Sequence, residues 1–138
     1  MVFNYPLVKH SSEIALREAM SRVFGELNAR IFNGNAPTNE EEPLIVIGES
    51  VNGPEFVTKA DEGEELLITI HIYTEEEGYD QLDQLTEDVL VALSSMPTQL
   101  DEHWAIVTYG IDAGSRKWRY APDKAHKILY VRFRCEYI

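Results

Sequence analysis

Two stretches of the chain carry apolar residues at helical spacing, and the first lies close to the N-terminus. The positions that share one helical face are Leu16, Met20, Val23 and Leu27. Because they recur at intervals of three and four residues, they predict a helix from about Ser12 to Arg30. Glu13 fits the first turn, where the helix dipole favours an acid, and the turn residues Asn33–Pro37 end the pattern.

The second helical pattern follows the acidic run Glu75–Glu77, which favours a helix N-terminus. Its apolar face consists of Leu82, Leu85, Val89, Ala92, Leu93 and Met96. Pro97 lacks the amide hydrogen that a continuing helix needs, so we expect this helix to end near Ser95.

Other stretches carry the patterns of β-strands. The run Leu44–Ser50 begins with β-branched residues typical of a buried strand, and Leu66–Thr74 alternates with a period of two. Together they suggest an antiparallel pair. Trp104–Ile111 is a further strand, and Leu129–Tyr137 alternates between one apolar and one charged face. Glu55–Ala60 is a candidate for a short strand.

The order of these elements predicts the fold class. Helix, two or three strands, helix and two strands would bury their apolar faces in two layers. We therefore expect an α+β fold with a mostly antiparallel sheet of four to five strands and both helices packed on one face. All of residues 1–138 would form one domain, in which 1–11 are an extension and 112–124 a protruding loop.

Composition and charge narrow the possible functions. The chain has 138 residues, of which 44% are hydrophobic, enough for a real core. The net charge is −12, with 24 acids against 12 bases. Because Lys and Arg supply the affinity for phosphate backbones and anionic lipids, this balance disfavours nucleic-acid binding and membrane attachment as the main activity.

The sequence also bears on the compartment. Cys135 is the single cysteine, so no internal disulfide can form. The first ten residues lack the regions of a signal peptide, and no apolar run approaches the ~18 residues of a membrane span. We expect a soluble protein made in a reducing cytoplasm.

No motif in the sequence points to catalysis, a metal or a cofactor. The four histidines are scattered and match no metal-binding spacing: His10, His71, His103 and His126. We interpret His71 as a solvent-facing or hydrogen-bonded residue of a sheet, and Cys135 as a small buried hydrophobe. Paired acids occur in turns and at a helix start, where they are solvated, and no phosphate-binding loop or nucleophile elbow is present. The expectation is a protein that is not an enzyme.

One basic and aromatic cluster contrasts with the acidic background. It consists of Arg116, Lys117, Trp118, Arg119 and Tyr120. Trp, Tyr and Arg often anchor protein interfaces, which favours a docking loop for an acidic partner or a neighbouring subunit. A nucleic-acid patch and a hairpin loop in which Trp118 covers the protein's own core remain open. Arg132 and Arg134 lie on the charged side of the last strand, where they are solvated or, in an oligomer, meet acids of a neighbour.

The order and spacing of several segments carry a resemblance. These segments are the helix Ile14–Ile31, Ile31–Gly34, Ala36-Pro37, Pro43–Glu49, Glu64–Tyr73, Asp80–Leu93 and Lys127–Arg134. In this order they resemble the phage tail terminator proteins, also called tail completion or tail-to-head joining proteins. The resemblance covers residues 14 to about 138, while residues 1–10 and the loop Asp112–Lys124 depart from it.

The resemblance implies a structural role in assembly. Members of this family form hexameric rings that sit on the completed tail tube, stop tube elongation and offer a surface to the head connector. The implied partners are further copies of the chain, the tail tube protein and the head-completion or connector protein, with DNA only in transit. The implied location is the head-proximal end of the virion tail, after assembly in the host cytoplasm.

Other functions stay open at this point. A neighbouring neck or head–tail joining protein would have a similar size and similar assembly work. A small-molecule-binding module or enzyme would need a pocket with convergent polar groups. An acidic adaptor or DNA mimic would gather its acids on one face.

Overall fold

The computed structural model describes residues 12–35, 43–52, 63–75, 80–111, 116–121 and 124–138. For residues 116–121 and 124 the description is limited to the pairing of the backbone. Within these ranges the chain forms two helices and six strands. Their order is α1 (Ser12–Phe24), β1 (Arg30–Asn33), β2 (Leu44–Asn52), β3 (Gly63–Thr74), α2 (Asp80–Ser94), β4 (Trp104–Ile111), β5 (Arg116–Ala121) and β6 (Lys124–Tyr137).

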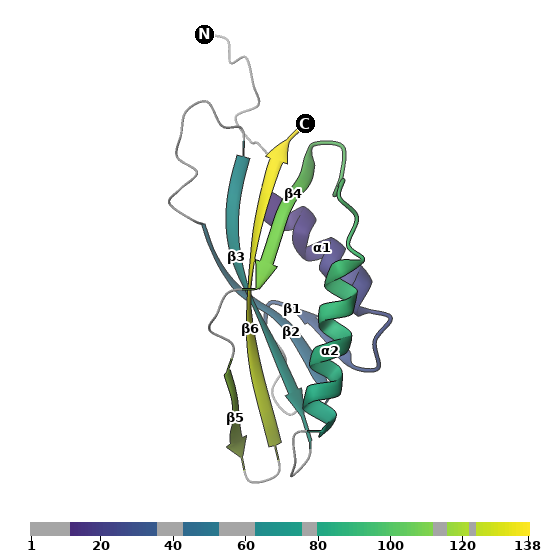
Figure 1. Cartoon of the computed structure of the whole chain (residues 1–138), viewed down its shortest axis with the longest axis vertical. Helices are drawn as coiled ribbons and strands as arrows, with labels where there is room; N and C mark the ends of the chain where they lie inside the picture. The colour runs from purple at the N-terminus through teal and green to yellow at the C-terminus, as the bar shows by residue number, and fades with distance from the viewer. Residues whose placement is uncertain (1–11, 36–42, 53–62, 76–79, 112–115, 122–123) are drawn as a thin grey trace.

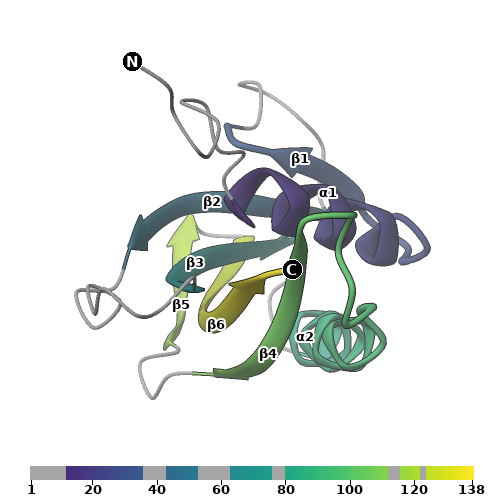
Figure 2. The same ribbon diagram turned by 90° about the horizontal axis from the view of Figure 1, so that it is seen from above.

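The strands form one mixed sheet in the order β1-β2-β3-β6-β4, in which β5 also pairs with β6. β1 and β2 are parallel, whereas the other pairs are antiparallel. Both helices lie on the same side of this sheet (Figures 1 and 2). The predicted α+β class and the mostly antiparallel sheet with both helices on one face are therefore confirmed.

The long strand β6 joins the two halves of the sheet. One of its edges pairs with β3 from Gly63↔Glu136 to Thr74↔Ala125. The other edge is shared, because β4 pairs with the part around Val131–Tyr137 and β5 with the part around Lys124–Ile128. Consequently β4 and β5 follow one another along the same edge of β6 and run in the same direction.

The hydrophobic core lies between the sheet and the helices. α1 packs against β1 and β2, while α2 packs against β3 and β6. The predicted apolar face of α2 is buried apart from Met96, which is partly buried, and alternate residues of β3 and β6 meet it. Cys135 is fully buried in this core, as the sequence predicts.

The first helix ends earlier than the spacing of its apolar residues suggested. α1 stops at Phe24, where the amide of Gly25 donates to the carbonyl of Ser21, and residues 25–29 turn back. Leu27 still packs against the core, which is why the helical pattern continued past the true end. Arg30–Asn33 instead forms β1, whose backbone pairs with Leu44–Ile47.

The prediction that residues 112–124 form a protruding loop is also largely wrong. Residues 116–121 form β5, because the N-terminal part of β6 extends beyond β4 and offers them an edge to pair with. Residues 112–115 and 122–123 lie outside the described residues, and so do 1–11 and the candidate strand Glu55–Ala60. The strands predicted at Leu44–Ser50, Leu66–Thr74 and Trp104–Ile111 are confirmed, and the last strand begins at Lys124.

Candidate interface site

The basic and aromatic cluster occupies β5. In the register, Arg116 is opposite Ile128, Lys117 is opposite Lys127 and Trp118 is opposite His126. The side chains of residues 116–120 lie outside the description, so their assignment to an interface stays a prediction.

Arg132 and Arg134 lie on the face of the sheet turned away from the helices. Their neighbours across the pairing are Leu67 and Glu65 on β3, and Gly110 and Thr108 on β4. The Nη1 atom of Arg132 is 2.8 Å from Oε1 of Glu65, so its charge already has a partner within the chain. The structure thus places these arginines next to β4, several residues along β6 from the cluster in β5.

Among the described residues, the edge of the sheet formed by β4 is covered only in part. Residues 98–100 cover its first half, since Gln99 bridges to Ala105 and the amide of Ile106 donates to the carbonyl of Thr98 at 2.6 Å. Beyond that point Val107, Tyr109 and Ile111 are 49, 43 and 40% exposed. β4 has no charged residue, although edge strands usually carry charges that block further pairing. β5 continues this edge, because it pairs with the next part of β6.

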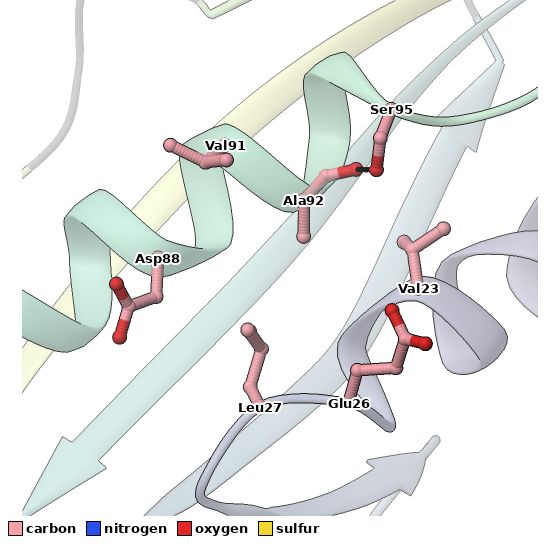
Figure 3. A pocket seen from close by; sticks show the side chains of 7 residues that line it. All are labelled: Val23, Glu26, Leu27, Asp88, Val91, Ala92 and Ser95. Carbon is pink, nitrogen blue, oxygen red and sulfur yellow. Dashed lines mark hydrogen bonds between the residues drawn. The ribbon is translucent and has the colours of Figure 1, made fainter.

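A hollow lies on the helical side, between the end of α1 and α2 (Figure 3). Its lining residues are Val23, Glu26, Leu27, Asp88, Val91, Ala92 and Ser95. The volume is about 240 Å³, which is smaller than the ~300–1,000 Å³ typical of sites for small molecules. It is large enough for a side chain. Val91 is 65% exposed at its edge.

The local structure of the chain creates this hollow. Because α1 ends at Phe24, the following turn carries Glu26 and Leu27 toward α2. In Figure 3 Leu27 lies between the carboxylates of Asp88 and Glu26, which come from the two different elements. No pattern in the sequence predicted this hollow. The one hint in the sequence was Val91, an apolar residue that does not belong to the apolar face of α2.

A pair of histidines lies on the opposite face of the sheet. The Nδ1 atom of His71 is 3.1 Å from Nε2 of His126, and Tyr73 stacks on His126 with ring centroids 4.1 Å apart. The carboxylate of Glu49 is 3.4 Å from the other ring nitrogen of His71. Burial, followed by the neighbouring His71, lowers the pKa of His126 to about 4. His71 is therefore a hydrogen-bonded sheet residue, one of the two interpretations offered by the sequence.

The described residues also bear on metal binding and on the reactivity of the thiol. Among the described residues, no group of three or more His, Cys, Asp and Glu side chains could hold a metal ion. Burial raises the pKa of Cys135 to about 12, so the thiol stays protonated at neutral pH. In the same part of the chain, no helix is long and apolar enough to cross a membrane.

A protein of known structure has a similar fold. A chain from a structure titled "Virion of native gene transfer agent (GTA) particle" superposes with a TM-score of 0.66 at 14% sequence identity, covering 93% of this chain and 99% of the other. At this identity the likeness concerns the fold alone. No curated protein matches the sequence significantly.

The sequence itself matches a protein family over most of its length. Residues 15–137 match the family described as "Tail completion protein gp17". This range includes both helices, all six strands and the hollow, apart from the first residues of α1. The chain therefore belongs to the gp17 family of phage tail completion proteins, which are structural proteins of the tail.

Proposed function

We propose that this chain is a subunit of a ring, hexameric in the assembled tail, that caps the tail tube. The ring stops further addition of tube subunits and then presents the surface to which the head connector binds. The observation that carries this proposal is the family match over residues 15–137. In this role the chain acts as one domain, performs no catalysis and is located at the head-proximal end of the tail.

The surface of the subunit suits a ring. Closed rings are built from heterologous interfaces, in which two different patches of each subunit meet. The open edge of β4 and the basic β5 provide one patch on one side of the fold. We assign subunit or partner contacts to Arg116, Lys117, Trp118, Arg119 and Tyr120 in this patch, and to Arg132 and Arg134 beside it.

The charge of the chain suits passage of DNA through such a ring. At −12 per chain, six copies would carry −72 formal charges. Like charges repel, and acids lining a channel would offer DNA no gain from counterion release. DNA would thus be in transit and not bound.

The test is the mass of the purified protein, measured by light scattering after size exclusion, with and without purified tail tubes. We expect six copies in solution, or conversion of single chains of 15.8 kDa to a ring on the tube end. Tubes that carry the protein should no longer elongate when tube subunits are added. A protein that remains single and ignores tubes at high concentration contradicts the proposal.

A further inference from the structure

We propose that the hollow between α1 and α2 receives the basic and aromatic strand β5 of a second copy of this chain. The inference rests on the proposed ring and names the two surfaces that meet in it. The seven residues around Leu27 and Val91 in Figure 3 form the hollow.

The lining of the hollow determines what it can bind. Val23, Leu27, Val91 and Ala92 supply the apolar part of the lining, and Glu26 and Asp88 contribute two carboxylates. α2 adds further negative charge, because it contains three more acids besides Asp88 and no basic residue. An apolar recess with acidic edges is complementary to an aromatic side chain that is flanked by cations.

Two described segments have that composition, but in Arg132–Phe133–Arg134 the aromatic ring is buried in the protein's own core, which leaves residues 116–120. Arg116, Lys117 and Arg119 supply three of the twelve basic residues of the chain within four positions, and Trp118 and Tyr120 lie among them. Trp, Tyr and Arg are the residues most enriched at the energetic centres of interfaces. The size of the recess, about 240 Å³, matches one large side chain rather than a free ligand.

The chain cannot fill its own hollow with this strand. β5 is held at the edge of β6, while the hollow opens between the two helices (Figures 1 and 2). Both views place β5 on the other side of the molecule from α1 and α2. The contact must therefore form between copies, and because the two patches differ it propagates head to tail until a ring closes.

Charge reversal tests the pairing. One variant carries Glu26→Lys and Asp88→Lys, and a second carries Arg116→Glu, Lys117→Glu and Arg119→Glu. Each alone should raise the concentration needed for assembly about tenfold or more, because attraction becomes repulsion. An equimolar mixture should assemble again, since the basic hollow of the first variant accepts the acidic strand of the second, and the unchanged surfaces also match.

The matched controls separate this contact from general charge effects. Glu18→Lys with Glu87→Lys makes the same change of charge on exposed positions of α1 and α2, outside the hollow, and should assemble normally. Val91→Lys should block assembly, whereas Val51→Lys, on a similarly exposed valine of β2, should not. Circular dichroism of each variant verifies that it is folded.

The outcomes are distinguishable by light scattering and by co-sedimentation with tail tubes. Assembly of the mixture but of neither folded variant alone supports the inference. If the wild type assembles and both charge-reversed variants do so equally well, or if their mixture stays dissociated, the hollow is not the partner of β5 while the proposed function stands. If the wild type neither forms rings nor binds tubes, the proposed function and this inference fail together.

Discussion

His71 and His126 meet across β3 and β6, with Nδ1 of the first 3.1 Å from Nε2 of the second. At least one of the two rings must be neutral to accept this hydrogen bond. His126 is the buried member, stacked on Tyr73, and its pKa is lowered to about 4 by burial and by the nearby His71. The hydrogen bond needs only one neutral ring, and burial favours the uncharged form of His126.

Acidification should destabilise the protein through His126. The unfolded chain takes up a proton near pH 6.5 and the folded chain only near pH 4, so this stabilisation is fully present above about pH 6.5 and is lost as the pH falls towards 4. The loss should be at most about 3 kcal/mol. The free energy of unfolding, measured with urea at a series of pH values, should depend less steeply on pH in His126→Gln than in the wild type. An equal slope in His126→Gln and in the wild type would contradict the assignment.

A side chain at Gly48 should lower the stability of the protein, because it would clash with the same histidine, His71. A Cβ atom at this position would lie 2.9 Å from Cδ2 of His71 and 3.3 Å from the carbonyl oxygen of Thr69. Gly48→Ala should therefore lower the free energy of unfolding by about 1–3 kcal/mol, as overpacking does elsewhere. Gly110→Ala is the control, because an added Cβ there meets nothing within 4 Å. Equal thermal midpoints for the two variants would disprove the clash.

Arg17 ties the first helix to the sheet. Its guanidinium donates to the carbonyl oxygens of Ile47 and Gly48 and pairs with Glu13, which also accepts a hydrogen bond from Ser50. Arg17→Ala removes all of these hydrogen bonds, although the carbonyl of Ile47 keeps the amide of Gly34 and Glu13 keeps Ser50 as donors. We expect the free energy of unfolding, measured with urea, to fall by about 1–3 kcal/mol. The exposed Arg22→Ala on the same helix should change stability by less than about 0.5 kcal/mol. A smaller effect at position 17 than at 22 would exclude this role.

Cys135 should react with thiol reagents only when the protein unfolds. The side chain is fully buried, and burial raises the pKa of its thiol to about 12. In native protein at pH 8, Ellman's reagent should thus label it at the rate of global or local opening, and in strong denaturant the single thiol should react at once. Rapid stoichiometric labelling of the native protein would show that the last strand is open to solvent.

The sequence was sufficient for the elements with a strong hydrophobic period. The alternation in Leu66–Thr74 and Leu129–Tyr137 and the apolar face of α2 predicted the elements that form the core. β1 was not predicted, because four residues are too few to show a period. The first helix was predicted too long, because Leu27 continues the helical spacing although it lies beyond a turn. β5 was not predicted as a strand, because its basic residues are typical of loops and its pairing depends on the length of β6.

The candidate interface could be predicted only in part. The composition of residues 116–120 marks one side of it, since such residues often anchor interfaces. The other side is assembled from the turn after α1 and from the C-terminal half of α2, which lie about sixty residues apart in sequence and meet only in the folded chain. No local pattern encodes a recess of this kind, because its existence depends on where α1 stops.

The position of β6 has a consequence for the timing of assembly. Its pairs with β3 join residues more than fifty positions apart, and such non-local contacts form slowly and late in folding. Until β6 docks, β4 and β5 have no strand to align them along one edge. Partly folded chains would thus lack the surface through which we propose that subunits meet, so the proposed ring would take up only subunits that had finished folding.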